Sequence, residues 1–274
     1  MGLLVRLALT ADVHANIEAL QATMKDIAAQ SVDRIVCLGD IVGYNTDPAQ
    51  CIALLRNANA LCIAGNHDRA VIGKITTESF SRTAARAAAW TRARLTEDEI
   101  AFLAGLPLRA NVEDKVLAVH GAFHPESGCE IVRLDNPQDI LSSFAALISD
   151  PSGARIGAFG HTHDAAVYEL RPNNGGPKLR TEPEGLLRED AYYLINPGTV
   201  GAPRSTDRRA HYMILDLAGR TVTARAVDYD ASAAFAKTRR AGLAPRLSFL
   251  PAPARRALVA AWALVQRAAQ AHLI

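Results

Sequence analysis

Short apolar runs alternate with amphipathic stretches along the first part of the chain. Residues 3–10 form a nearly continuous apolar run, which is typical of a strand covered on both faces. Residues 16–30 repeat apolar positions at helical spacing, and a second apolar run follows at 35–38. A strand, a helix and a further strand in this order predict a right-handed parallel crossover, and therefore an α/β fold.

The same pattern predicts more elements and a change of sheet type after about residue 164. Asp47 and Pro48 begin a helix, residues 76–106 form two helices divided near Leu95, and Asn136 and Pro137 begin another helix. The further strand predictions are residues 61–64, a hairpin of 108–112 and 115–119, 156–159, and an antiparallel group of 165–170, 192–195, 211–217 and 221–227. Residues 171–190 are rich in Pro, Gly and charge, which predicts a long surface loop or an extended hairpin tip.

The tail is predicted to be helical from Ala231 onward. Residues 255–273 are rich in alanine and repeat Leu258, Trp262 and Val265 along one face. We therefore expect a main domain at 1–230 and a helical extension at 231–274 that packs on that domain. A homodimer contact is the second possibility for this helix. A helix lying on a membrane surface ranks third, because its polar face holds few basic residues.

Composition excludes several classes of protein. The chain has 274 residues, long enough for one large domain with an appendage. Its net charge of +2 is too small to indicate a basic surface that binds long nucleic acid. The four cysteines form no C-x-x-C pair, which favours buried free thiols and a reducing, cytoplasmic compartment. The N-terminus has no cleavable signal, and no apolar stretch approaches the roughly 18 residues of a membrane span.

Candidate chemistry gathers where the apolar runs end. Asp40 follows the buried run at 35–38, and a carboxylate there can bridge two divalent cations with its two oxygens. Other metal-ligand residue types follow the other runs: Asp12 and His14, Asn66 and His67, His120, and His161 and His163. We hypothesise that they converge on Asp40 in a two-metal site that hydrolyses phosphoesters.

Alternatives remain for single motifs. Asp12 taken alone is as well explained as the N-cap of a helix, with His14 in solvent. The pair His161 and His163 belongs to a short His-x-His pattern that also arises by chance. Asn66 and His67 are adjacent and cannot both face the same way, which suits one ligand and one catalytic group that binds no metal.

The ordered set of motifs carries a family resemblance. Asp12-x-His14, Gly39-Asp40, Gly65-Asn66-His67-Asp68, His120-Gly121 and Gly160-His161-x-His163 resemble the motifs of the calcineurin-like metallophosphoesterase superfamily. Residues 39–44 and 196–201 look like its small bacterial and archaeal phosphodiesterase-type branch. The resemblance extends over roughly residues 3–227.

This resemblance implies a fold and a ligand set. The fold is a four-layer α/β/β/α sandwich of two mixed sheets flanked by helices, with the site at the carboxyl ends of the strands. One metal takes Asp12, His14, Asp40 and His163. The other takes Asp40, Asn66, His120 and His161. His67 matches the family's histidine that binds no metal and lies next to the leaving group.

The chemistry of these residues agrees with the resemblance. Imidazole and carboxylate ligands without thiolate suit two ions of Mn, Fe, Zn, Co or Ni better than Ca. A bridging water of lowered pKa would supply hydroxide to attack phosphorus, and protonated His67 would assist the leaving oxygen. Four further residues could bind phosphate or base, although a structural role is equally favoured for each: Tyr44, Arg69, His124 and Arg204.

Three function classes compete. The favoured one is a hydrolase of phosphodiesters, phosphomonoesters or nucleotides, with dinucleoside polyphosphates as an alternative substrate. A scaffold that has lost catalysis should lack ligands, whereas this chain has the complete set and His67. A nuclease is disfavoured by the low net charge and by the absence of a basic and aromatic stripe in the sequence.

Overall fold

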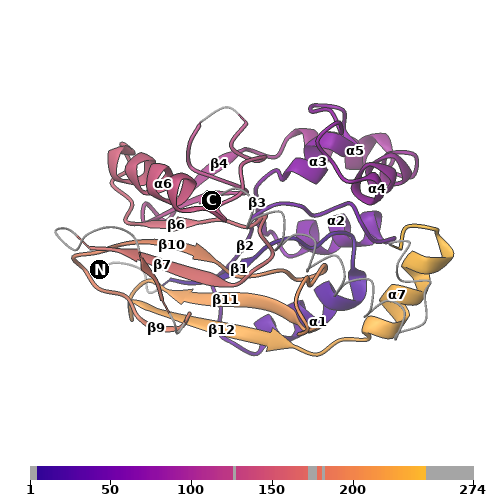
Figure 1. Cartoon of the computed structure of the whole chain (residues 1–274). Coiled ribbons are helices and arrows are strands. Elements are labelled where there is room, and N and C mark those ends of the chain that lie inside the picture. Colours follow the sequence, from indigo (N-terminus) through magenta and orange to yellow (C-terminus); the bar gives the residue numbers. More distant parts are fainter. Residues whose placement is uncertain (1–4, 126–127, 172–177, 181–182, 245–274) are drawn as a thin grey trace, which may run out of the picture.

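Two mixed β-sheets stack face to face in the computed structural model, which describes residues 5–125, 128–171, 178–180 and 183–244 (Figure 1). Within these residues the first sheet has the order β3 (Leu61–Cys62), β2 (Arg34–Cys37), β1 (Arg6–Thr10), β11 (Ala210–Asp216), β12 (Thr221–Val227) and β9 (Gly185–Leu186). The second has the order β4 (Arg109–Val112), β5 (Val116–Val119), β6 (Ile156–Ala158), β10 (Tyr192–Asn196), β7 (Ala166–Leu170) and β8 (Lys178–Leu179).

Parallel pairing occupies one part of each sheet. Strands β1, β2 and β3 run parallel, as do β5, β6 and β10. The pairs β1 with β11, β11 with β12, and β10 with β7 are antiparallel. The predicted parallel pairing of β1 with β2 is therefore confirmed. The predicted change to antiparallel pairing holds for β7, β11 and β12, whereas β10 also pairs parallel with β6, because it lies between β6 and β7 in the sheet.

The main apolar core lies between the two sheets. Leu7 and Leu9 of β1 point into it together with Val36, Met213 and Ile195, and all five are fully buried. Each such side chain stabilises the fold by roughly 1.5–3 kcal/mol relative to an exposed position. Because strands from both sheets are needed to bury these residues, the relative placement of the strand ends is fixed by packing.

Helices cover the two outer faces and complete the predicted four-layer α/β/β/α fold. One outer cluster joins the first sheet to α1 (Ile17–Ala28), α2 (Pro48–Asn57), α3 (Asn66–Val71), α4 (Arg82–Arg92) and α5 (Glu97–Ala104). On the other outer face, α6 (Pro137–Ser149) buries Phe144 and Leu147 against the second sheet (Figure 1). The six-residue helix α3 was not predicted from the sequence.

Most helix starts follow the expected capping chemistry. Asn16 accepts a hydrogen bond from the first turn of α1, and Thr96 forms a capping box with Glu99 at α5. Asp47 does precede α2, but its side chain makes no capping bond. It accepts instead from Lys237 Nζ at 2.5 Å, because helix α7 (Ala231–Arg240) reaches this point.

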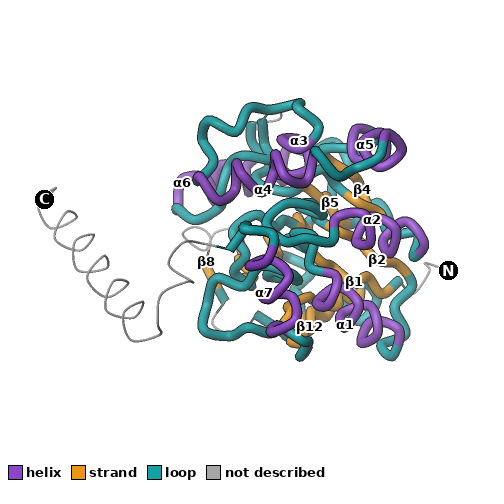
Figure 2. The backbone as a smooth tube through the Cα atoms, turned by 90° about the vertical axis from the view of Figure 1, so that its right-hand side faces the viewer, coloured by secondary structure: helices purple, strands orange, loops and turns teal. Residues whose placement is uncertain are grey.

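Helix α7 lies beside α1 (Figure 2). Lys237 pairs with Glu18 of α1 at 2.7 Å as well as with Asp47. The predicted helix at 255–273 and its packing or dimer role fall outside the described residues. The proposed domain boundary near residue 230 stays a prediction.

The loop predicted at 171–190 contains two short strands in its described part, and these lie at sheet edges. Strand β8 ends the second sheet and β9 ends the first. The four cysteines are free and buried, as expected. Among the described helices, none is long and apolar enough to cross a membrane.

A close backbone approach at Gly201 gives a testable prediction. A Cβ placed there would lie 1.8 Å from the carbonyl oxygen of Val13, so Gly201→Ala must push apart two loops. We expect a loss of about 1–3 kcal/mol and a melting temperature lower by several degrees, measured by thermal unfolding in chelator. Gly105→Ala is the control, since the nearest atom to its Cβ would be the Ala101 carbonyl oxygen at 3.5 Å. Equal melting temperatures for the two variants would contradict the steric argument.

Candidate metal centre

The loops that follow the parallel strands meet at one place. Asp12 and His14 follow β1, Asp40 follows β2, Asn66 begins α3 after β3, His120 follows β5, and His161 and His163 follow β6. These carboxyl-terminal ends belong to both sheets, so the meeting point lies at their shared edge. Most of these side chains are buried; His161 is partly exposed. The structure therefore brings together every residue predicted to bind metal.

The first group of possible ligands contains Asp12, His14 and His163. The Nε2 atoms of His14 and His163 lie 3.2 Å apart. Asp12 Oδ1 lies 3.4 Å from His163 Nε2 and 3.8 Å from His14 Nε2. These three atoms can hold one cation.

The second group contains His120, His161 and Asn66. The rings of His120 and His161 have centroids 5.0 Å apart, and both residues group with Asp40 as a possible metal cluster. Asn66 Oδ1 lies 3.1 Å from His120 Nε2. The amide oxygen therefore faces the same point as the imidazole nitrogen.

Asp40 stands between the two groups. Its Oδ2 lies 3.5 Å from His14 Nε2 on one side and 3.5 Å from His120 Nε2 on the other. Its Oδ1 accepts a hydrogen bond of 2.8 Å from the backbone N–H of His67. A backbone donor thus contacts Oδ1, whereas Oδ2 faces both groups. The bridging of two cations by both carboxylate oxygens stays a prediction.

Backbone carbonyls orient the histidine rings. Three rings place Nδ1 at a carbonyl oxygen: His14 at Val42 (3.2 Å), His120 at Leu38 (2.7 Å) and His163 at Ala202 (2.7 Å). A ring that donates from Nδ1 offers the Nε2 lone pair to the centre. His161 is reversed, because its Nε2 lies 3.2 Å from the Ile131 oxygen, so its Nδ1 is the free ligand atom.

The donor set fits cations. Asp12 Oδ1 is buried and has no hydrogen-bond partner among the described residues. It faces the Nε2 lone pairs of His14 and His163, and acceptors at such short distances repel one another. A divalent ion between them removes the repulsion and satisfies all three atoms. Nitrogen and oxygen donors without thiolate suit Mn, Fe, Zn, Co or Ni.

Burial sets the protonation of most groups in the metal-free protein. It lowers the pKa of His161 and of His163 to about 3 and holds the pKa of His14 well below its usual value. Burial also raises the pKa of Asp12 to about 7. The three histidines are therefore neutral at pH 7, the form that binds metal.

His120 behaves differently. Burial alone would lower the pKa of His120, but the adjacent Asp40 carboxylate outweighs burial and raises it to about 10. The imidazolium then neutralises Asp40, whose pKa lies well below its usual value despite burial. A cation in the second group replaces that proton, so binding releases it.

The backbone of the site is strained. Left-handed φ angles occur at Asp12 (53°), His14 (49°), Asp40 (53°), His161 (66°) and His163 (68°). Each costs a residue with a Cβ roughly 1–2 kcal/mol. Backbone hydrogen bonds between the loops hold this geometry. One of them runs from the His14 N–H to the backbone carbonyl oxygen of Asp40 at 2.8 Å.

His67 lies beside the first group. Its ring is 5% exposed and packs against the rings of Tyr44 and Phe80, with centroids 4.6 and 4.8 Å away. Its Nδ1 has no hydrogen-bond partner among the described residues. Gly43 makes room for it, since a Cβ there would meet His67 Nδ1 at 2.4 Å. A ring nitrogen of His67 also lies within 4.8 Å of ligand atoms of His14 and Asp40, a spacing that suits a metal-binding group.

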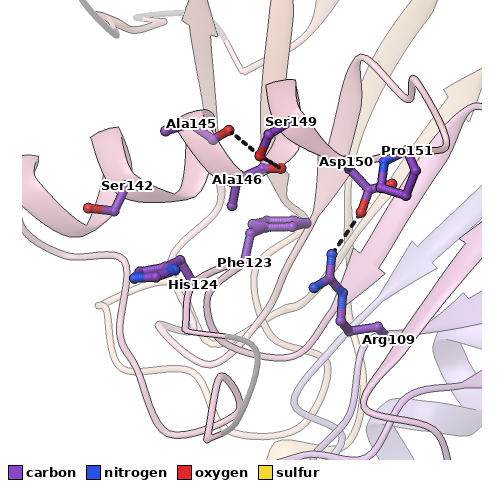
Figure 3. Close-up of a pocket in the computed structure, with 9 residues that line it drawn as sticks. All are labelled: Arg109, Phe123, His124, Ser142, Ala145, Ala146, Ser149, Asp150 and Pro151. Atoms are coloured by element: carbon purple, nitrogen blue, oxygen red, sulfur yellow. Dashed lines mark hydrogen bonds and ion pairs between the residues drawn. The ribbon is translucent and has the colours of Figure 1, made fainter.

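The four residues considered for substrate binding have different surroundings. Tyr44 and Arg204 line one cavity with His163, and Arg204 Nη2 lies 3.1 Å from His163 Nε2. Arg69 pairs at 2.9 Å with Glu130, which is 2% exposed. His124 lines a separate cavity beside α6 that also contains Arg109 and Asp150 (Figure 3).

Asp68 was overlooked in the sequence as a positioning residue. Its fully buried carboxylate accepts from the backbone N–H of Val42 at 3.0 Å and of Gly65 at 2.9 Å. It thereby ties the start of α3 to the loop that carries Asp40. Its place directly after His67 in the Gly-Asn-His-Asp block was the available signal.

Asn196 has a similar positioning role. Its amide donates to the Gly160 carbonyl at 2.8 Å and to Thr162 Oγ1 at 2.9 Å, so it orients the loop that carries His161 and His163. The turn-rich segment at 196–201 had been recognised only as part of the resemblance.

Comparison with known proteins supports the sequence resemblance. The family model for the calcineurin-like phosphoesterase superfamily domain matches residues 5–220. The chain is 35% identical over 235 residues to MJ0912, an uncharacterized protein of Methanocaldococcus jannaschii. That alignment covers 84% of this chain and 90% of the relative.

Two solved structures have a similar fold. A metallophosphoesterase from Sphaerobacter thermophilus matches with a TM-score of 0.72 and 33% identity, covering 89% of this chain and 96% of that one. The hypothetical protein PH1004 from Pyrococcus horikoshii matches with a TM-score of 0.69 and 16% identity, covering 88% and 95%. The second comparison supports the fold alone.

The position of Asp40 predicts a loss of metal at both groups. We expect Asp40→Asn to bind fewer divalent ions than the wild type, because a neutral amide does not balance two dications. The measurement is metal content per chain after stripping and reloading with Mn. The exposed Asp228→Asn is the control and should keep the wild-type content. Two ions per chain in Asp40→Asn would disprove the shared role of Asp40.

Proposed function

The chain belongs to the calcineurin-like phosphoesterase superfamily, and from this membership we propose that it is a phosphoester hydrolase that uses two divalent cations. The observation that carries the proposal is Asp40 Oδ2, which lies equally far from a ligand nitrogen of each buried group. A residue shared in this way is what a two-cation centre needs.

In this proposal the cations take the expected ligands. Asp12, His14, Asp40 and His163 hold one ion. Asp40, Asn66, His120 and His161 hold the other. When bound, the ions supply Lewis-acid activation of water and neutralise the charge of the phosphoryl group.

Arg204 and Tyr44 border the centre on the side of the larger cavity. A guanidinium is suited to bind phosphoryl oxygens through paired hydrogen bonds. Arg204 therefore orients the phosphoryl group and neutralises part of its charge. Tyr44, with its ring 4.5 Å from the His14 ring, limits access of water from that side.

His67 protonates the leaving oxygen. Burial lowers the pKa of His67, so the ring is neutral at pH 7 in the free protein. The negative charge of a bound phosphoester favours the protonated ring and raises its pKa. The Nδ1 atom, which has no hydrogen-bond partner within the described ranges of the chain, offers a position for that proton. The rate should fall as pH rises through the pKa of His67 in the complex, because the acid is then lost.

The substrates we propose are small phosphodiesters, phosphomonoesters or nucleotides, with dinucleoside polyphosphates as the alternative. The near-neutral charge of the chain supports small substrates over long nucleic acid. The complete ligand set supports catalysis over a purely structural role. The four free thiols support the expected reducing, cytoplasmic compartment.

A substrate panel tests the function. Protein stripped of metal and reloaded with Mn is assayed with bis(p-nitrophenyl) phosphate, p-nitrophenyl phosphate, a dinucleoside polyphosphate and an oligonucleotide. We expect metal-dependent hydrolysis of at least one small ester and an intact oligonucleotide. A protein that binds two ions and hydrolyses none of them would be a scaffold.

The role of His67 predicts a dependence on the leaving group. We expect His67→Gln to retain its metal and to lose roughly 10²–10⁴-fold in kcat with an alkyl leaving group. The loss should be smaller with p-nitrophenol, which leaves without protonation. Steady-state kinetics over a series of leaving groups, with metal content measured in parallel, checks this.

His211→Gln is the matched control, since His211 lies near the surface Asp207 and lines neither described cavity. An equal loss across all leaving groups would show that His67 binds phosphate or stabilises charge instead. Loss of metal in His67→Gln would show that His67 is a ligand.

A further inference from the structure

The cavity beside the metal centre is larger than a phosphate group requires. Its volume is about 830 Å³, within the range of roughly 300–1,000 Å³ found for sites that bind organic ligands. Its lining includes Tyr44, His163 and Arg204 from the metal loops. It also includes Tyr229 and Phe235 from the C-terminal segment. A phosphoester bound at the metals would therefore have room for a substantial organic group.

The lining of the cavity combines charged and apolar groups. Arg204 and Arg208 supply positive charge, and the described lining residues include no Asp or Glu. Tyr229, Phe235 and Leu243 supply aromatic and apolar surface. An anionic group joined to an apolar body is the kind of ligand that matches such a lining.

Phe235 is the residue that a ligand would most affect. It is 42% exposed, and among the described residues it is one of few large apolar side chains left open to solvent. Because it lines a cavity, a ligand can cover its ring without any rearrangement of the fold. An aromatic ligand ring would gain a stacking contact as well as burial.

The segment that carries Phe235 is fixed to the metal loops. Thr238 Oγ1 donates to Asn45 Oδ1 at 2.8 Å, and the Asn45 amide donates to the His14 carbonyl at 2.9 Å. Lys237 adds ion pairs to Glu18 and Asp47. This preorganised C-terminal wall, residues 229–243, lies beyond the 5–220 match of the family model. Its contribution to the cavity therefore lies outside the matched family domain.

We propose that the C-terminal wall determines substrate specificity by binding an aromatic substituent of the phosphoester against Phe235. The phosphoryl group then lies at the metal centre beside Arg204. The inference rests on the proposed function for its location and deepens it by naming the substrate class, phosphoesters that carry an aromatic organic group.

Binding of non-hydrolysable probes tests the proposal without turnover. Methylphosphonate, phenylphosphonate and 2-naphthylphosphonate are titrated into Mn-loaded protein by calorimetry. We expect wild-type affinity to rise with ring size. Phe235→Ala should weaken 2-naphthylphosphonate about tenfold and leave methylphosphonate unchanged. Phe235→Leu, which keeps an apolar side chain, should fall between the two.

Leu141→Ala is the matched control. Leu141 is 47% exposed and lies on α6, and it lines neither described cavity. It should keep the wild-type preference for larger rings. The proposal is overturned if the wild type has no such preference, or if Phe235→Ala retains it or weakens all three probes equally.

Kinetics separate this inference from the proposed function. Methyl and 2-naphthyl p-nitrophenyl phosphates share one leaving group and differ only in the other substituent. Phe235→Ala should raise KM about tenfold for the naphthyl ester and by a smaller factor for the methyl ester, whose only aromatic group is the p-nitrophenyl leaving group. If the protein binds aromatic phosphonates through Phe235 but hydrolyses neither ester, the assignment of the cavity stands and the hydrolase proposal is wrong.

Discussion

Buried acceptor atoms that face one another are the constraint on which this site depends. Asp12 Oδ1 and the Nε2 atoms of His14 and His163 lie within 3.8 Å of one another, and Asp12 Oδ1 has no hydrogen-bond partner among the described residues. Burying such acceptor atoms side by side is costly until a proton or a cation joins them, and the surrounding fold must hold them together. The inter-sheet core, the carbonyls that orient the rings and the buried carboxylate of Asp68 supply that rigidity.

The fold was largely predictable because its pattern is local. Apolar runs predicted the strands, the pairs Asp47-Pro48 and Asn136-Pro137 predicted helix starts, and ligand residue types followed strand ends. Parallel strands deliver their carboxyl ends to one edge of a sheet, so convergence of the loops followed from strand order. The sequence therefore predicted Asp40 at the meeting point of the loops, where its carboxylate lies 3.5 Å from His14 Nε2 and from His120 Nε2.

Other features depend on contacts that no local pattern contains. Helix α3 is short, and its first residues also serve as candidate site groups, so its sequence resembled a loop. The two Asp40 carboxylate oxygens have different surroundings, because Oδ1 accepts a hydrogen bond from the His67 backbone N–H, which only folding brings near. The Asp47 side chain makes no capping bond and pairs instead with Lys237, which lies 190 residues away in the sequence. Left-handed φ angles at residues with a Cβ likewise reflect tertiary forces that override local preference.

The order of β11 in the first sheet has a consequence for synthesis of the chain. Strand β11 pairs with β1, although 200 residues separate Ala210 from the end of β1 at Thr10. The last candidate ligand is His163, and the carbonyl that orients it belongs to Ala202. A nascent chain that has not yet emerged to residue 216 therefore lacks the strand that completes the edge of β1. During translation all candidate ligands are therefore synthesised before the first sheet is complete, so the final arrangement of the candidate site depends on its last strands.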